Sequence, residues 1–200
     1  MIISDGAGTN YEMKVGLDHR AHVDAVTFGK SEIEVERGNG YNVNTGAITL
    51  TDATPTSVLY VKTNEDKPVI ITALFYMTGV STGGSGDQII TVYKNPTAGS
   101  IITNAVDAEM PAVNRNFGSS KTFDGNVYKG ATADNDFTDG DKVIESLLNA
   151  SSKRTVLAVG DIVMPKGSSL GISITPPAGN TSMQVEFAIS MFIDSLSEEK

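Results

Sequence analysis

The sequence predicts an all-β protein: an antiparallel β-sandwich of the jelly-roll type, with an extended N-terminal arm and one long insertion loop. The clearest observation is that apolar residues occupy every second position from Met183 to Ile193, with mostly polar residues between them. Side chains alternate between the two faces of a strand, so this run has one apolar face. Two more apolar runs precede it, and turns rich in Pro, Gly, Ser and Asn separate the three. About eight to ten such runs with no helical pattern indicate a sandwich or barrel.

Length and composition fit one domain, or one domain with an arm. The chain has 200 residues, a formal net charge of -9 and no cysteine, so neither a disulfide nor a thiolate metal site can form. The negative charge argues against nucleic acid or an anionic membrane as the main partner. No run is long and apolar enough to span a bilayer, and the N-terminus lacks the pattern of a signal peptide. We therefore expect synthesis in the cytoplasm.

The extended arm is predicted over residues 1–37. Charged and histidine side chains are frequent there and apolar ones are sparse, although weak alternation at Val23–Thr27 allows one short strand. The sandwich domain is predicted over residues 38–195, because Gly38–Gly40 is a turn signal and β-type runs follow it. Residues 196–200 are a predicted flexible acidic tail.

The strands of the domain follow in order, bounded by polar turns. Pro68–Thr78 is nearly all apolar, which predicts a central strand buried on both faces. Lys142–Asn149 fits a strand or one helical turn, and we favour a strand. The other expected strands are Ala47–Thr51, Ser57–Lys62, Asp87–Lys94, Thr155–Met164, Leu170–Thr175 and Ser182–Asp194.

Regular patterning is lost over residues 104–140, after the short apolar run Ser100–Thr103. This segment is too long for an ordinary connection. It is predicted to be a large insertion loop with one short strand near Asn126–Tyr128. An exposed cluster of aromatic side chains in this region would favour recognition of a host surface. The candidates are Phe117, Phe123, Tyr128 and Phe137.

Two short motifs near the N-terminus weakly suggest a binding site. Gly29-Lys30-Ser31 matches the end of a phosphate-binding P-loop, but Asp24 stands where the leading glycine belongs and no strand-loop-helix pattern surrounds it. A turn is the better interpretation. His19 and His22 are the only histidines, and they would share a face only on a helix, which this stretch does not predict. We interpret them as solvated arm residues, with a pH-sensing contact between subunits as the alternative.

The acidic stretch 134–145 partly matches a calcium-binding loop. Asp134, Asp136, Thr138, Gly140 and Glu145 occupy template positions 1, 3, 5, 7 and 12. The template requires glycine at position 6, where this chain has Asp139, and flanking helices are not predicted. We therefore expect a solvated loop without structural calcium. No serine lies in a nucleophile-elbow pattern, and no carboxylate pair suggests acid-base catalysis.

Four segments carry a resemblance to known proteins: Leu59–Lys62, Val92–Gly99, Val113–Ser120 and Met164–Met183. Together they resemble a diffuse group of virion proteins of tailed bacteriophages, which are β-sandwich proteins attached to heads or tails. The likeness covers roughly Tyr41–Ile193 apart from the acidic part of the insertion. The group has no catalytic residues to transfer.

The resemblance implies a non-enzymatic virion structural protein that decorates or cements a phage capsid, binds the major capsid protein and stabilises the head. The arm would anchor it to the shell, and a homo-oligomer, most simply a trimer, is expected. The alternative is a tail- or fibre-associated protein whose loops bind a host-surface receptor or glycan. No catalytic, cofactor-binding or metal-binding residue is assigned, and neither nucleic acid nor a membrane is an expected partner.

Overall fold

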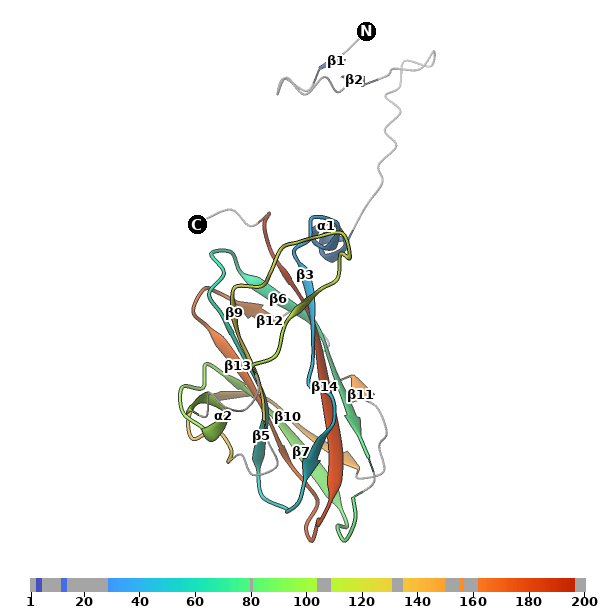
Figure 1. Ribbon diagram of the computed structural model, residues 1–200, viewed down its shortest axis with the longest axis vertical. Coiled ribbons are helices and arrows are strands. Elements are labelled where there is room, and N and C mark those ends of the chain that lie inside the picture. Colours follow the sequence, from blue (N-terminus) through green and yellow to red (C-terminus); the bar gives the residue numbers. More distant parts are fainter. Residues whose placement is uncertain are drawn as a thin grey trace. The chain divides into compact units, whose positions relative to one another are not determined.

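The chain divides into two compact units, Met1–Lys30 and Ser31–Lys200. The computed structural model describes residues 3–4, 12–13, 29–79, 81–103, 109–130, 135–149, 155–156 and 162–196 (Figure 1). In the first unit, strand β1 (Ile3–Ser4) pairs antiparallel with β2 (Glu12–Met13). The possible strand at Val23–Thr27 lies outside the described residues, as do residues 197–200 of the predicted tail.

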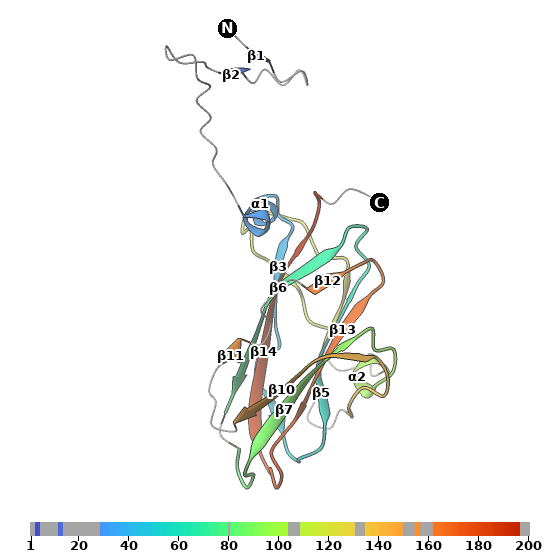
Figure 2. The same cartoon turned by 180° about the vertical axis from the view of Figure 1, so that it is seen from behind.

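The second unit is a sandwich of two antiparallel sheets (Figures 1 and 2). The order in one sheet is β10-β7-β13-β5-β9, and in the other it is β11-β6-β14-β3-β8, where β12 also pairs with β6 and β4 with β14. The first sheet contains β5 (Thr56–Thr63), β7 (Asp87–Lys94), β9 (Gly125–Lys129), β10 (Asp141–Asn149) and β13 (Ser169–Thr175). The second contains β3 (Gly40–Asn44), β4 (Ile48–Leu50), β6 (Val69–Thr78), β8 (Val113–Asn114), β11 (Thr155–Val156), β12 (Ile162–Met164) and β14 (Met183–Ile193).

The connectivity is that of a jelly roll, which confirms the predicted fold class. Strands β3 and β4 share one side of β14, and β11 and β12 share one side of β6. Counting each pair as one strand and setting aside β8 and β9 leaves four strands in each sheet. The chain passes to the other sheet at every step except from β7 to β10, which are neighbours. Eight strands wound in this way form a jelly roll.

The core lies between the two sheets, and β14 supplies a large part of it. Its alternation is confirmed, because Met183, Val185, Phe187, Ile189 and Met191 are all buried in the same cluster. Each fully buried side chain of this size stabilises the fold by about 1.5–3 kcal/mol. The inner faces of the strands therefore hold the two sheets together.

Strand β6 is inside its sheet as predicted, but the prediction that both of its faces are buried is wrong. Its inner face is buried, while Thr72, Ala73 and Phe75 are partly exposed and Met77 is exposed. The reason is that the outer face of this sheet is only partly covered within the described part of the chain. An apolar composition alone could not distinguish a half-covered strand from a fully buried one.

The expectation that no helix forms is also wrong. Helix α1 (Lys30–Glu36) falls inside the predicted arm, and α2 (Ser100–Thr103) follows β7. Val35 of α1 packs against Gly40, where an added Cβ would lie 2.4 Å from a Val35 methyl group. Glu34 is fully buried. Residues 31–37 therefore belong to the sandwich unit, and the first unit ends at Lys30 instead of residue 37.

The insertion between β7 and β10 closes one side of the sandwich. Its strand β8 pairs with β3 at the edge of one sheet, and β9 pairs with β5 at the edge of the other. The predicted short strand near Asn126–Tyr128 is thus confirmed as β9. Glu109 bridges to Tyr128, and the Met110 N–H donates to the Val127 carbonyl, so β9 is covered in turn. Covering a strand edge removes a site for unwanted pairing.

Candidate functional site

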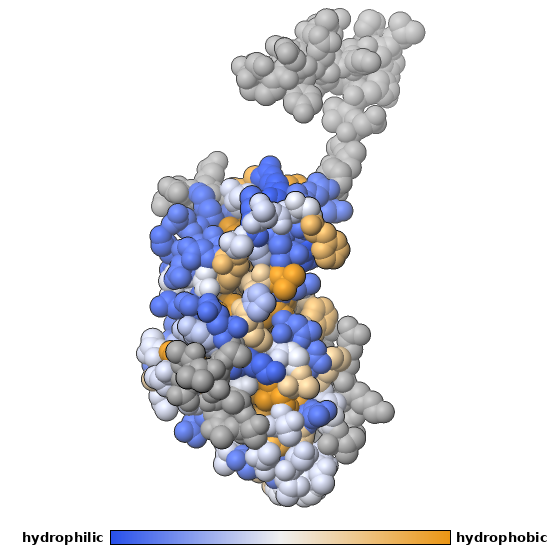
Figure 3. Space-filling view, viewed as in Figure 1, coloured by the Kyte–Doolittle hydropathy of each residue, from blue (hydrophilic) through white to orange (hydrophobic). Residues whose placement is uncertain are grey.

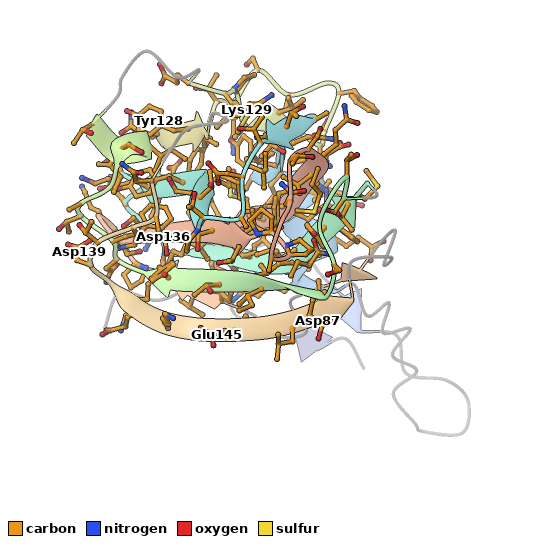
Figure 4. All side chains as sticks on the ribbon, turned by 90° about the horizontal axis from the view of Figure 1, so that it is seen from below. Asp87, Tyr128, Lys129, Asp136, Asp139 and Glu145 are labelled. Atoms are coloured by element: carbon orange, nitrogen blue, oxygen red, sulfur yellow. The ribbon has the colours of Figure 1, made fainter. Side chains whose placement is uncertain are left out.

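The acidic stretch does not converge on one point in the structure. Asp136 accepts a hydrogen bond from the Tyr93 hydroxyl at 3.0 Å, and Glu145 lies on β10 in an ion pair with Lys142 at 2.8 Å. Figure 4 shows Glu145 along β10, away from Asp136 and Asp139. Asp134 is outside the described residues. The part of the chain that the structure describes contains no group of three or more His, Cys, Asp or Glu placed to hold a metal ion.

Asp139 has a structural partner at the end of β7. Its carboxylate accepts hydrogen bonds from the Thr97 N–H at 2.8 Å, the Ala98 N–H at 2.9 Å and the Thr97 hydroxyl. The Thr97 hydroxyl and these backbone groups lower the pKa of Asp139. Burial, followed by the Asp136 carboxylate, raises the pKa of Tyr93. These carboxylates thus hold the insertion against the β7 turn.

Calcium should therefore leave the stability of the protein unchanged. Tight calcium binding would stabilise the folded state by about 2.7 kcal/mol at a hundredfold excess over the dissociation constant. Melting curves in chelator and in millimolar calcium are expected to coincide, for the wild type and for Asp134→Ala/Asp136→Ala alike. A calcium-dependent rise in Tm that disappears in the double variant would contradict this expectation.

The Gly29-Lys30-Ser31 motif does not form a P-loop in the described part of the chain. Gly29 precedes α1, and Lys30 and Ser31 begin that seven-residue helix. A P-loop would need a strand immediately before this turn, and none is described there. His19 and His22 lie outside the described residues. None of the helices in the described ranges is long and apolar enough to cross a membrane.

The four aromatic residues of the insertion do not form an exposed cluster, so the feature that would have favoured recognition of a host surface is not found among them. Phe123 packs on Tyr41 at 5.8 Å between ring centroids. Tyr128 stacks on Tyr60 at 5.9 Å, and Phe137 is buried against the same tyrosine. These rings cover the outer face of the β5 sheet and an edge of the core. Only Phe117 of the four is exposed, and its side chain is 100% accessible.

Phe117 stands at the tip of a turn that hydrogen bonds fix to the end of α1. We call this turn, residues 114–119, the Phe117 turn. The Asn114 amide donates to the Gly38 carbonyl at 2.8 Å, and the Asn116 amide donates to the Glu36 carbonyl at 2.8 Å. The Arg115 N–H donates to the Gly40 carbonyl at 2.8 Å. A turn held in this way loses little backbone conformational entropy when a partner covers it.

A polar network around the buried Glu34 ties the same end of the domain together. The Glu34 carboxylate accepts hydrogen bonds from the Asn39 amide at 2.7 Å and from the Ser195 hydroxyl at 2.8 Å. Lys121 donates to the Asn39 side-chain oxygen at 2.8 Å, and Arg37 donates to the Ser195 hydroxyl at 3.3 Å. Helix α1, the insertion and the end of β14 are thereby joined around one carboxylate.

The large hydrophobic side chains that remain exposed in the described ranges fall mainly into two groups. Phe117 and Leu196 each follow a residue that is hydrogen-bonded to α1, and Val113 lies on β8 beside β3. Val143 and Leu147 on β10, and Val163 on β12, lie on the side of the sandwich that the insertion leaves open. On the face drawn in Figure 3, hydrophobic residues form small areas between hydrophilic ones.

A groove of about 680 Å³ lies at the open side, and we call it the edge groove. Its apolar lining includes Val92, Ile102, Val143, Ile162, Val163, Met164 and Leu170. Three lysines also line it, Lys62, Lys94 and Lys166, and the described lining residues include no carboxylate. Lys166 is paired with Asp66 at 2.5 Å, which lowers the pKa of Asp66 and raises that of Lys166. This groove could not be predicted from the sequence, because its walls come from strands that meet only in the folded sandwich.

Comparison with known proteins adds little to these observations. No family model and no curated protein matches the chain. A solved structure described as the 2.6 Å structure of T=1 particles derived from infectious bursal virus is similar over 77% of this chain, with a TM-score of 0.22 and 5% identity. The match spans 39% of that protein's own chain. So weak a likeness to a virus particle protein lends no weight to a shared function.

Proposed function

We propose that the chain is a non-enzymatic structural protein of a virus particle, one that decorates or cements the capsid of a tailed bacteriophage by binding its major capsid protein. The observation that carries the proposal is the arrangement around α1. A jelly-roll domain has exposed apolar side chains at the helix through which the chain continues into a separate N-terminal unit. A separate arm and an exposed apolar surface give a subunit two means of attachment to a neighbour.

The segments that resemble phage virion proteins support the same function. Leu59–Lys62 lies within β5, and Met164–Met183 runs from β12 through β13 to the start of β14. Val113–Ser120 contains the Phe117 turn. The likeness therefore involves both the sandwich and one of its exposed apolar sites. In this proposal the protein assembles as a homotrimer on the capsid surface, and neither nucleic acid nor a membrane is a partner.

The test is to locate the protein on purified particles of the virus that encodes it and to count its copies. A regular copy number for each capsomer is the expected result. A few copies at one vertex would replace this proposal with the alternative, a tail or fibre protein whose exposed Phe117 turn contacts a host-surface receptor or glycan. Absence from the particles would overturn both.

The arm is expected to attach the domain without stabilising it. Because Glu34 is part of the domain, the informative deletion removes residues 1–29 and keeps α1. The truncated protein should melt within a degree or two of the full chain, since it loses none of the sandwich core. Its binding to particles that lack the protein should be abolished. Wild-type occupancy by the truncated protein would place the attachment surface on the sandwich instead.

A further inference from the structure

We propose that the chain cross-links itself: the amine of Lys121 displaces ammonia from the side-chain amide of Asn39, and the buried carboxylate of Glu34 transfers the proton. The product is an isopeptide bond between the insertion and the segment that joins α1 to β3. Only groups of this chain take part in the reaction, so it does not depend on the capsid role proposed above.

The three side chains stand in the order that this reaction requires. Lys121 Nζ donates to Asn39 Oδ1 at 2.8 Å, and Asn39 Nδ2 donates to a Glu34 carboxylate oxygen at 2.7 Å. Because a C=O bond is about 1.2 Å long, the amine nitrogen is at most about 4 Å from the amide carbon. Reacting atoms in a near-attack geometry are about 3–3.5 Å apart. A small movement of a flexible lysine side chain is therefore enough for attack.

The amide that is attacked belongs to a residue with a fixed backbone. The Asn39 N–H donates to the Glu34 carbonyl at 2.8 Å, and the Asn39 carbonyl accepts from the Ile193 N–H at 2.9 Å. Asn39 is only 7% exposed, so its amide meets neighbouring side chains more than water. Groups held together in this way react as if they were at a very high concentration.

The carboxylate beside the amide is also oriented. Glu34 is fully buried, and the Ser195 hydroxyl lies 2.8 and 2.9 Å from its two oxygens. The Ser195 N–H donates to one of these oxygens at 3.1 Å. A carboxylate that touches the leaving nitrogen is placed to act as general base and then as general acid.

The insertion delivers the lysine as it passes α1 between β8 and β9 (Figure 1). The Lys121 N–H donates to the Ser119 hydroxyl at 3.2 Å, and its carbonyl accepts from the Asn114 amide at 3.1 Å. That amide also donates to the Gly38 carbonyl at 2.8 Å. A Cβ added to Gly38 would collide with the Ser119 hydroxyl. Glycine next to Asn39 thus allows the insertion to approach the amide closely.

The reaction balances without any other reactant. Lys121 is exposed, so its ammonium group can release a proton to water before the attack. The uncharged amine then forms a C–N bond to the Asn39 amide carbon. In the intermediate both nitrogens are bonded to one carbon, so Glu34 takes a proton from Nζ and gives it to Nδ2. The bond from carbon to Nδ2 breaks, ammonia leaves, and the carboxylate is regenerated.

A competing reaction would lose ammonia in another way. Asn39 precedes Gly40, and the backbone nitrogen of a following glycine can attack an asparagine amide to form a cyclic imide. Gly40 begins β3 and is paired with Phe192 of β14, which holds its backbone in the sheet. The amine of Lys121 is therefore the better-placed nucleophile.

The position of the bond suggests what it would do. Helix α1 connects the sandwich to the separate unit Met1–Lys30, and β3 is the first strand of the sandwich after it. A pull on the N-terminal unit reaches Asn39 before it reaches β3. The isopeptide bond would transfer that force to the insertion, so that β3 is not peeled from β14.

The first experiment is mass spectrometry of the full chain. The intact mass is expected to be lower than that calculated from the sequence by one ammonia molecule. Trypsin should release a branched peptide in which Gly38–Lys62 is joined to Asn116–Lys129, because the modified Lys121 is no longer a cleavage site. The inference is overturned if the full calculated mass persists after prolonged incubation of the purified chain, or if ammonia is lost while trypsin still cleaves after Lys121.

The second experiment removes the nucleophile and the proton carrier separately. Lys121→Arg keeps a positive charge and a hydrogen-bond donor and should abolish the branched peptide. Its matched control is Lys129→Arg, because Lys129 lies in the same insertion and donates to the Ala47 carbonyl at 3.2 Å; this variant should cross-link like the wild type. Glu34→Gln should slow the reaction at least about a hundredfold, with folding checked by circular dichroism.

Two results would contradict these assignments. Loss of ammonia from Lys121→Arg would identify the Gly40 nitrogen as the nucleophile instead of the lysine. A folded Glu34→Gln chain that cross-links at the wild-type rate would show that the carboxylate transfers no proton. A purely structural network would leave the mass of every variant at its calculated value.

Discussion

Replacing Phe187 by aspartate is expected to prevent the chain from folding into a soluble domain. Phe187 is fully buried in β14 and packs against Tyr76 with 4.9 Å between ring centroids. Removing such a ring costs about 3–5 kcal/mol, and burying an unpaired carboxylate costs several kcal/mol more. The sum approaches the whole stability of a typical domain, about 5–15 kcal/mol. The measurement is the soluble yield and the thermal melting curve.

The neighbouring substitution Glu186→Lys is the control for Phe187→Asp. Glu186 points to the other face of β14 and is partly exposed, so its replacement should change Tm by no more than a few degrees. If Phe187→Asp were purified and melted like the wild type, the register of β14 would be wrong. Every side chain of that strand would then face the opposite side.

Replacing Glu34 by alanine is expected to destabilise the domain by about 3 kcal/mol, because the buried Asn39 amide would be left without its acceptor and Ser195 would lose its bond to the helix. For a chain of this length the corresponding fall in Tm is roughly 6–12 °C. The loss should be accompanied by faster hydrogen exchange of the α1 amides, since the carboxylate joins the helix to the end of β14. Differential scanning calorimetry and exchange mass spectrometry measure the two effects.

Two variants distinguish this explanation from a simple loss of helix packing. Glu34→Gln keeps one oxygen acceptor and should lose less stability than Glu34→Ala. Glu32→Ala changes an exposed acidic residue of the same helix and should be nearly silent. Equal melting temperatures for Glu34→Ala and Glu32→Ala would show that the network contributes nothing to stability.

The sandwich could be predicted because the alternation of buried and exposed side chains along its strands is visible in the sequence as an alternation of apolar and polar residues. The alternation in β14 follows directly from a strand with one face in the core and one face partly in solvent. The choice of a strand for Lys142–Asn149 is confirmed by β10, although its apolar residues are fewer. Turns rich in Gly, Pro and Asn favour tight backbone turns, and they separate β12, β13 and β14 as expected. The single strand expected over Thr155–Met164 is wrong, because two short strands, β11 and β12, lie at the two ends of that range.

The helix α1 could not be predicted, because its stability depends on residues far away in the chain. Seven residues are too few to form a helix on their own. Glu34 would be unfavourable in the interior without Ser195, which is 161 residues away in the sequence. A charged residue in a polar stretch therefore suggested a solvated arm.

The candidate surfaces could not be predicted from the sequence, because they also depend on contacts between distant parts of the chain. Phe117 and Phe137 have similar surroundings in the sequence, but one ends fully exposed and the other packs on Tyr60 and Tyr93. The difference arises from where the insertion docks on the two sheets. The edge groove likewise requires β10 and β12 to be in place, and only the jelly-roll crossings bring them there.

The position of β14 in its sheet has a consequence for how the protein is made. This strand pairs with β6 on one side and with β3 and β4 on the other, yet the ribosome produces it after all of them. At typical translation rates the early strands wait roughly 10–30 s for their central partner. During that time the apolar faces of the nascent chain remain available to chaperones. A chain that stops before Met183 would lack the strand that unites the sheet, so incomplete translation products cannot reach the native fold and are exposed to degradation.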